Sequence, residues 1–262
     1  MITPSLPRSL IPKTLLRVLI LCHALINESN GVILIKPTVK VGRDSEANVG
    51  STGRERRFEF KGGVPCLDFI NTLAWRLTDH PAEYLGSYED VLAWGKQAGL
   101  LAPEEAEALS RWAAADPEEA RSTLSRAIAL REAIHRVFSA EIAGEPQDQG
   151  ALLALNRELS GALSRLRVAP AADEAYVWAW DRGGDDSGGG PPPDRPLWPV
   201  ARSAAELLTS PKLGRVKVCD GEGCGWMFLD ESRNTSRRWC DSRSCGNRER
   251  VRDYLARKRA SD

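Results

Sequence analysis

Two matched pairs of cysteines near the end of the chain constrain its fold more than any other feature. Four of the six cysteines follow a C-x4-C, fifteen residues, C-x4-C pattern: Cys219, Cys224, Cys240 and Cys245. Two close pairs on two short turns can surround one Zn²⁺ as a tetrahedron. No histidine lies nearby, so the ligands would all be sulfur, and such a closed set is structural because catalytic zinc keeps a position open for water. The alternatives are two disulfides or four unrelated buried cysteines.

The residues around these cysteines form a second pattern. Residues 225–229 (Gly-Trp-Met-Phe-Leu) are predicted as a short apolar strand beside the metal, and an Arg-Arg-Trp run ends immediately before Cys240. The last cysteine opens the sequence Cys-Gly-Asn-Arg at residues 245–248. Together these motifs resemble the CGNR-type zinc finger over about thirty residues. The resemblance implies a zinc-stapled module of the kind carried by bacterial transcription regulators.

Charge is distributed unevenly along the chain. Residues 233–259 contain ten Lys or Arg and three Asp or Glu, so they carry a formal charge of +7, whereas the whole chain is neutral. The remaining residues therefore carry −7, and the pattern predicts a basic C-terminal module on an acidic body. We expect arginines of this module to contact nucleic acid: Arg237, Arg238, Arg248, Arg250, Arg252 and Arg257.

A basic helix is predicted from about Asn247 onward. At about 100° per residue, Val251, Tyr254 and Leu255 fall on one stripe, which we expect to pack on the zinc core. Arginines border the stripe on both sides, so the docked helix would present a basic patch to phosphates. The alternative is a solvated basic helix that has no partner.

A motif at residues 62–72, Gly-Gly-x-Pro-x-Leu-Asp-Phe-x-Asn-Thr, marks the first domain. It resembles the start of the ABATE domain, which typically precedes a CGNR finger in a family described as stress-induced transcription regulators. Within the motif, Asp68 and Asn71 are three residues apart and could share a helix face. They would form either a polar pair for a small ligand or the backbone, or caps and internal hydrogen bonds. Cys66 is expected to be a small buried hydrophobe.

Amphipathic helices are predicted through most of the first domain. Ser87 opens a helix that stops near Gly99, and Asp116 followed by Pro117 opens a long one that runs to Gly144. Further helices are predicted over residues 103–115, 152–166 and 198–208, which is typical of a helical bundle. Residues 165–168 and 176–180 are predicted as short strands, and their aromatic side chains favour packing over stacking on bases. The predicted fold class is therefore mainly α (α+β), with a few short strands and a small four-cysteine zinc-finger domain after the helices.

The chain is expected to have three parts. Residues 1–56 hold six of the ten isoleucines and differ in composition from the rest, so we expect a disordered extension or a mis-called start. Residues 57–210 would form the ABATE-like helical domain, with a flexible loop at 181–196, and would fold without the finger. Residues 211–262 would form the zinc finger and its basic helix. The apolar run at residues 15–22 is too short to span a bilayer, so no membrane contact is expected.

The motifs favour a binding protein over an enzyme. The sequence has no Walker loop, no dinucleotide fingerprint after a strand, and no zinc-protease or nucleophile-elbow motif. We expect a DNA-binding transcription regulator in the bacterial cytoplasm, whose helical domain senses an unidentified effector or forms a homodimer. The alternatives are a protein-interaction module that docks its basic tail on an acidic surface, and an RNA-binding protein.

Overall fold

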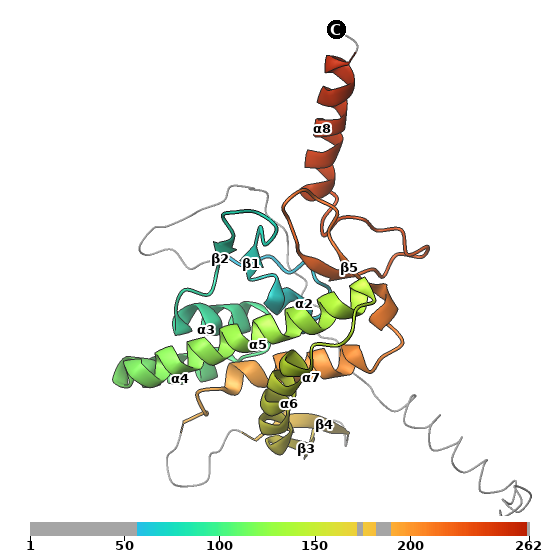
Figure 1. The fold of residues 1–262 in the computed structure, drawn as a ribbon. Coiled ribbons are helices and arrows are strands. Elements are labelled where there is room, and N and C mark those ends of the chain that lie inside the picture. The colour runs from blue at the N-terminus through green and yellow to red at the C-terminus, as the bar shows by residue number, and fades with distance from the viewer. Residues whose placement is uncertain (1–56, 172–174, 182–189, 261–262) are drawn as a thin grey trace, which may run out of the picture. The chain divides into compact units, whose positions relative to one another are not determined.

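The structure is a computed structural model that describes residues 57–171, 175–181 and 190–260 (Figure 1). The extension at residues 1–56 and residues 182–189 of the predicted loop lie outside the described residues, so the expectations for them are not addressed. The described part contains seven α-helices and three two-stranded antiparallel sheets. This confirms the predicted mainly α class. Within the same part, no helix combines the length and apolar character needed to cross a membrane.

The elements follow one another in a simple order. The helices are α2 (Pro65–Ile70), α3 (Tyr88–Gln97), α4 (Pro103–Ala115), α5 (Pro117–Ala143), α6 (Gln149–Ser164), α7 (Trp198–Leu208) and α8 (Cys245–Arg259). The strand pairs are β1 (Leu73–Ala74) with β2 (Ala82–Glu83), β3 (Leu166–Pro170) with β4 (Tyr176–Trp180), and β5 (Val216–Val218) with β6 (Met227–Leu229). Two short 3-10 turns, Arg195–Leu197 and Leu213–Arg215, precede α7 and β5.

The helix ends lie where their capping residues predict. The side chain of Ser87 accepts a hydrogen bond from the backbone N–H of Asp90, whose carboxylate accepts one from the Ser87 N–H, and this capping box opens α3. The Asp116 carboxylate accepts from Glu119 N at 3.1 Å and opens α5. The same helix ends at Gly144, which has a left-handed φ of 65°. The sequence rules for helix termini are therefore confirmed for these elements.

Helix α2 lies at the centre of the hydrophobic core. Leu67 and Phe69 are fully buried, and the helix packs on α5, α7 and β6 (Figure 1). The Phe69 ring meets Trp94 of α3 edge-on, with ring centroids 4.8 Å apart. Cys66 is also fully buried, and burial raises the pKa of its thiol to about 12, so it is an inert core residue. Gly62 permits a close approach, because a Cβ there would lie 2.8 Å from the Leu67 backbone.

The same core continues into the C-terminal segment. Val216 of β5 and Met227 and Leu229 of β6 are buried in one cluster with side chains of α2, α5 and α7. The backbone N–H of Leu229 also donates to Gly62 O at 2.8 Å. The segments on either side of residues 210–211 therefore share one apolar core. That these residues form a domain boundary stays a prediction.

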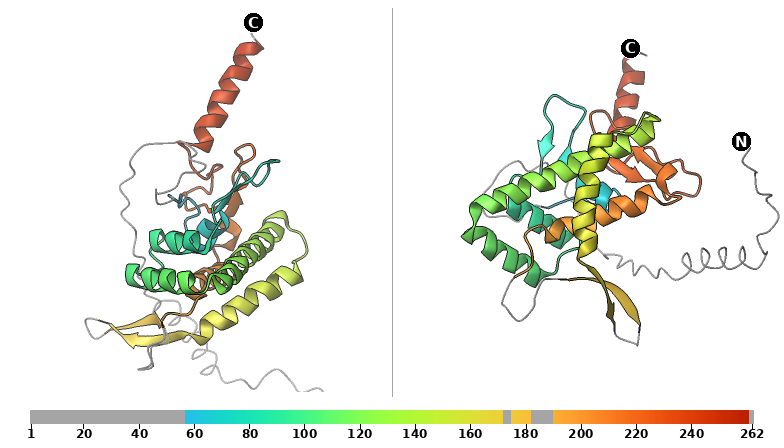
Figure 2. Two further views of the ribbon diagram at one scale, coloured as in Figure 1. Left: turned by 90° about the vertical axis from the view of Figure 1, so that its left-hand side faces the viewer. Right: turned by 60° about the horizontal axis from the view of Figure 1, so that its bottom comes forward.

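The β3–β4 hairpin leaves much of its surface uncovered. Trp180, at its base, contacts Trp198 of α7 with ring centroids 5.7 Å apart. Tyr176 and Trp178 are instead 77% and 56% exposed. The expected packing of the aromatic residues holds for Trp180 and is wrong for the other two, because the hairpin extends past the helices that would have covered them (Figure 2).

Candidate metal centre

The four paired cysteines converge on one point of the finger. Their ligand atoms all lie within 4.8 Å of one another and all four residues are buried. The sulfurs of Cys224 and Cys240 are 3.8 Å apart, and those of Cys240 and Cys245 are 3.6 Å apart. Tetrahedral zinc with Zn–S bonds of about 2.3 Å separates its sulfurs by about 3.8 Å, so the set fits the metal. None of the four forms a disulfide, and together they form the site of one structural zinc.

Two tight turns present these thiols. The β5–β6 hairpin carries the first pair, with Cys219 N donating to Trp226 O at 2.8 Å and Cys224 N to Gly221 O at 3.0 Å. The second pair lies where α8 begins, and Cys245 is the first residue of that helix. A Cβ at Gly221 would lie 3.1 Å from the Cys245 sulfur, so a larger residue there would press on the sulfurs.

Hydrogen-bond donors surround the sulfurs, as expected around zinc thiolates. The Cys219 sulfur accepts from Gly221 N at 3.4 Å and from Cys240 N at 3.2 Å. The guanidinium of Arg248 donates to the Cys245 sulfur at 2.9 Å. Hydrogen bonds among the four sulfurs lower the pKa of Cys245 and raise those of Cys224 and Cys240, so they only redistribute protons within the set. The Arg248 charge and the backbone N–H donors come from outside the set and favour the thiolate form that a metal requires.

A buried carboxylate anchors the loop between the two cysteine pairs. Asp230 is fully buried and accepts from Lys217 Nζ at 2.7 Å, Ser232 N at 2.9 Å and Arg237 N at 3.0 Å. Burial alone would raise the pKa of Asp230, but these donors outweigh it and hold the pKa well below its usual range. Sequence spacing does not show that donors of three residues converge on Asp230.

Arg237 is held inside the finger. Its guanidinium donates to four backbone carbonyls: those of Lys61, Leu229, Trp239 and Cys240. It also lies over the Phe228 ring, 4.2 Å from the ring centroid. A guanidinium that uses four of its five N–H groups in this way stabilises the loop. These contacts give Arg237 a structural role in the loop, and its contact with nucleic acid stays a prediction.

The other five predicted arginines lie at the surface of the finger or along α8. Arg238 pairs with Asp220 at 2.8 Å and is exposed. Arg250 donates to Ser242 O at 2.7 Å, and Arg257 donates to a carbonyl of its own helix. Arg252 pairs with Glu222 and Glu249 of the finger and helix. Arg248 lies over the Trp75 ring, 4.5 Å from its centroid, in addition to its contact with sulfur.

The predicted docking of α8 on the zinc core is wrong. Val251, Tyr254 and Leu255 are 49%, 61% and 45% exposed, and only the first two residues of the helix are buried. The helix leaves the finger and extends away from it (Figures 1 and 2). The zinc core is instead filled by aromatic residues of the finger and by Trp75, which lies far away in the sequence. No spacing rule indicated that Trp75 would occupy that place.

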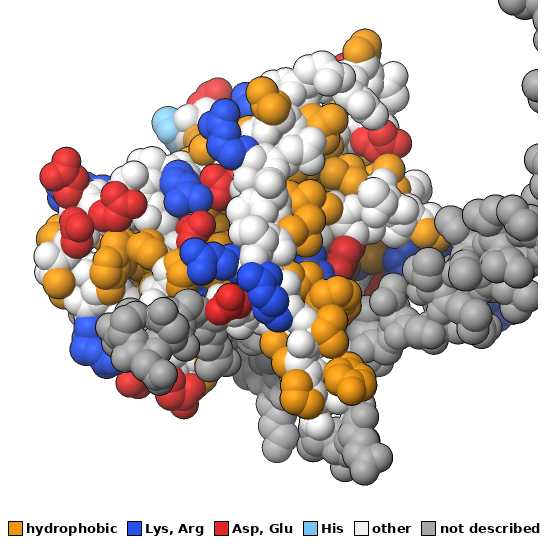
Figure 3. Space-filling view, turned by 90° about the horizontal axis from the view of Figure 1, so that it is seen from below, with side chains coloured by type: hydrophobic (Ala, Val, Ile, Leu, Met, Phe, Trp, Pro, Cys, Tyr) orange, Lys and Arg blue, Asp and Glu red, His pale blue; other side chains and the backbone are white. Residues whose placement is uncertain are grey.

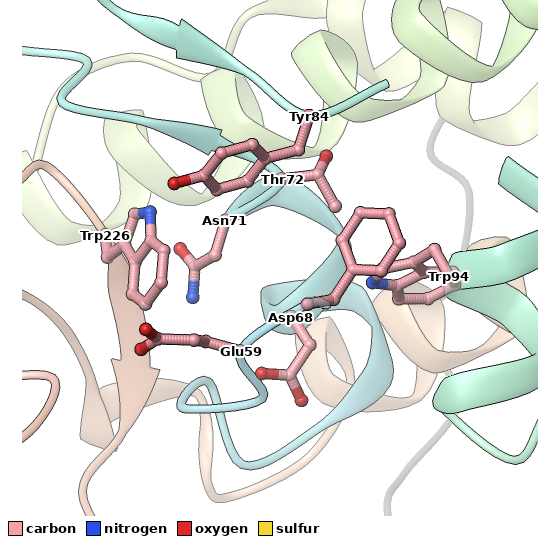
Figure 4. Close-up of a pocket in the computed structure, with 8 residues that line it drawn as sticks. Glu59, Asp68, Asn71, Thr72, Tyr84, Trp94 and Trp226 are labelled. Atoms are coloured by element: carbon pink, nitrogen blue, oxygen red, sulfur yellow. The ribbon is translucent and has the colours of Figure 1, made fainter. Parts of the chain in front are cut away.

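Asp68 and Asn71 join the motif of the first domain to the finger. The Asn71 amide donates to Met227 O at 2.9 Å and accepts from Met227 N at 2.9 Å, so it pairs with β6 as a neighbouring strand would. Asp68 accepts from Gly62 N at 2.7 Å. Figure 4 shows the two side chains among Trp94, Trp226 and their neighbours, which leave no room for a water molecule between them. These contacts support the structural alternative over the ligand-binding one.

Comparisons with known families agree with this geometry. Residues 63–211 match the ABATE family, described as "Putative stress-induced transcription regulator". Residues 215–258 match the CGNR zinc finger. A search of curated proteins found no match. Because the first match covers more than half of the 262 residues, the chain belongs to the ABATE family and carries a CGNR zinc finger after its ABATE domain.

Proposed function

We propose that this protein is a DNA-binding transcription regulator of the bacterial cytoplasm, and that α8 is its principal DNA contact. The observation that carries the proposal is the surface of α8. This helix holds six Lys or Arg against two acids, and residues 251–260 are all exposed. The description of the ABATE family supports a role in regulation. We propose a binding role rather than catalysis for both domains.

The charges of α8 are arranged around its apolar stripe. At about 100° per residue, Val251, Tyr254 and Leu255 lie between two basic flanks. One flank consists of Arg248, Arg252 and Arg259, and the other of Arg250 and Arg257. The two acids of the helix, Glu249 and Asp253, lie opposite the stripe. Lys258 falls within the stripe near the end of the helix. This face of α8 is therefore mainly apolar in the middle, with one lysine, and basic on both sides.

This face fits the major groove of duplex DNA. An α-helix with its side chains is about 10–12 Å wide, and the groove is about 12 Å wide. In the groove, the two basic flanks would meet the phosphates of the two strands, and the stripe would face the base edges and thymine methyl groups. The exposed ion pairs of Arg252 stabilise by at most about 1 kcal/mol, so phosphates can replace their carboxylates.

The test is binding of the full zinc-loaded chain to genomic duplex fragments as a function of salt. The variant Arg250→Ala/Arg252→Ala/Arg257→Ala changes only arginines that contact neither a sulfur nor the loop carbonyls held by Arg237. We expect it to weaken duplex binding at least tenfold and to lower the slope of log K against log salt by about 3, because each arginine that no longer neutralises a phosphate lowers the slope by about 1.

A matched triple variant controls for the loss of positive charge alone. Arg111, Arg121 and Arg157 are exposed on α4, α5 and α6, and changing them to Ala should leave binding and salt slope unchanged. Zinc content should stay at one per chain in both variants. If the wild-type protein binds neither duplex nor single strand at low salt, the protein-interaction alternative replaces this proposal. Tighter binding to RNA than to duplex DNA would favour the RNA alternative.

A further inference from the structure

The β3–β4 hairpin presents an uncharged apolar face to solvent. The strand register pairs Val168 with Trp178 and Pro170 with Tyr176, so these four side chains lie on the same face. Val168, Tyr176 and Trp178 are all more than half exposed. Hydrophobic side chains gather on this side of the molecule when it is seen from below (Figure 3). A contiguous exposed patch rich in aromatic residues is typical of an interaction surface.

The outer edge of β4 is suited to strand pairing. Ala171 N donates to Ala175 O at 2.8 Å and Asp181 N to Arg165 O at 2.7 Å. Because hydrogen-bonded and non-hydrogen-bonded pairs alternate in an antiparallel ladder, the backbone N–H and C=O groups of Tyr176, Trp178 and Trp180 point away from β3. The described part of the chain supplies no third strand to this sheet.

The two edges of the hairpin differ in how readily they can pair with another strand. β3 contains Arg167, whose charge disfavours pairing at an edge, and Pro170, which lacks a backbone N–H. Residues 175–180 contain neither a charge nor a proline. The nearby guanidinium of Arg202, which lies 5.8 Å from the Trp178 ring centroid, is itself paired with Glu206. An uncharged edge strand of this kind is a site of association.

We propose that two copies of this chain associate through β4. The strand would pair antiparallel with the same strand of the second copy about a two-fold axis close to Trp178, which extends each hairpin into one four-stranded sheet. An identical strand offers the same donors and acceptors in reverse order, so the contact is self-complementary. In this pairing the apolar side chains of the two copies lie beside one another on one face of the four-stranded sheet, and those nearest the axis contact each other. A second copy therefore satisfies the unpaired edge of β4 and covers part of the apolar side chains.

The size of the patch sets the strength of the contact. A fully buried Tyr or Trp covers about 150–250 Å², so the exposed side chains of each copy offer on the order of 400 Å² at most. Edge pairing covers only part of this area, so two copies would bury less than about 800 Å², below the roughly 1,200–2,000 Å² of stable complexes. The dimer should therefore be weak and dependent on concentration. α8 lies at the opposite end of the described chain from the hairpin, so the contact leaves it accessible (Figures 1 and 2).

The test is sedimentation velocity of the full zinc-loaded chain, without DNA, from about 1 to about 200 μM, which brackets a micromolar association. We expect the sedimenting species to shift from one chain to two within this range. Trp178→Lys places a charge on the edge and removes apolar area, so it should raise the dissociation constant at least tenfold. The control Leu153→Lys introduces the same charge at an exposed leucine of α6 and should leave it unchanged.

Hydrogen exchange of the wild-type protein gives a second readout that needs no variant. Exchange at the amides of Tyr176, Trp178 and Trp180 should slow as the concentration rises, while the outer amides of β3 should not change. A chain that stays monomeric over the whole range overturns the proposal. So does a dimer that Trp178→Lys does not weaken, since the copies would then meet elsewhere. Neither readout depends on DNA binding.

Discussion

At the scale of single residues, the most informative side chain is Asp68. Burial raises the pKa of its carboxyl to about 7, whereas an unfolded chain has a value of about 3.9. The folded protein therefore holds a proton that the unfolded chain releases between these values. Stability from this group is fully present below about pH 4 and is lost as the pH rises to about 7, by an amount on the order of a few kcal/mol.

The variant Asp68→Asn isolates this effect. Its amide oxygen can still accept from Gly62 but does not titrate. His135 acts in the opposite direction within the same window, because burial lowers the pKa of its imidazole to about 4. His135 is present in both proteins, so subtracting the variant's unfolding free energy from that of the wild type removes the contribution of His135. We expect the difference, measured by urea unfolding, to fall as the pH rises from 4 to 7, and a difference that stays constant would contradict the assignment.

The adjacent arginines Arg237 and Arg238 give a second prediction at this scale. Arg237 donates to backbone carbonyls of the finger, whereas Arg238 is exposed and makes a surface ion pair. Arg237→Ala leaves carbonyls without donors and should destabilise the finger by about 2 kcal/mol or more. Arg238→Ala should change the stability of the finger little, because an exposed ion pair contributes little to it. The readout is the rate of zinc transfer to a chromogenic chelator; equal rates in the two variants would show that Arg237 has no special structural role.

At the scale of elements, short-range rules predicted most of the fold. Capping residues and apolar periodicity placed α3, α5 and α7 close to their observed bounds, because those signals depend on neighbours in sequence. The cysteine spacing likewise predicted the metal centre. The docking of α8 could not be predicted in this way, because it depended on what else would fill the zinc core. Trp75 fills part of that place from a distant loop, and the apolar stripe of α8 is left at the surface.

At the scale of the whole molecule, the ABATE domain and the finger are joined by a shared core. Val216, Met227 and Leu229 are buried against the helices, and Asn71 pairs with the backbone of Met227. From the sequence, residues 57–210 were expected to fold alone. The amphipathic patterns show which helix faces are apolar, but they do not show which segment of the chain covers those faces. The structure shows that part of this cover comes from the two strands of the finger.

Two fragments test this dependence. The fragment 57–210 lacks three buried apolar side chains, each of which contributes about 1.5–3 kcal/mol, and leaves the Asn71 amide unpaired at a cost of about 1–3 kcal/mol. The sum approaches the roughly 5–15 kcal/mol that stabilises a whole domain, so this fragment should lack a cooperative thermal transition. The fragment 57–232 keeps β5 and β6 and should retain one without zinc, because these strands rather than the metal complete the core. Thermal unfolding of both fragments can be monitored by circular dichroism. Cooperative transitions with the same melting temperature in both would show that the helical domain is independent of the finger.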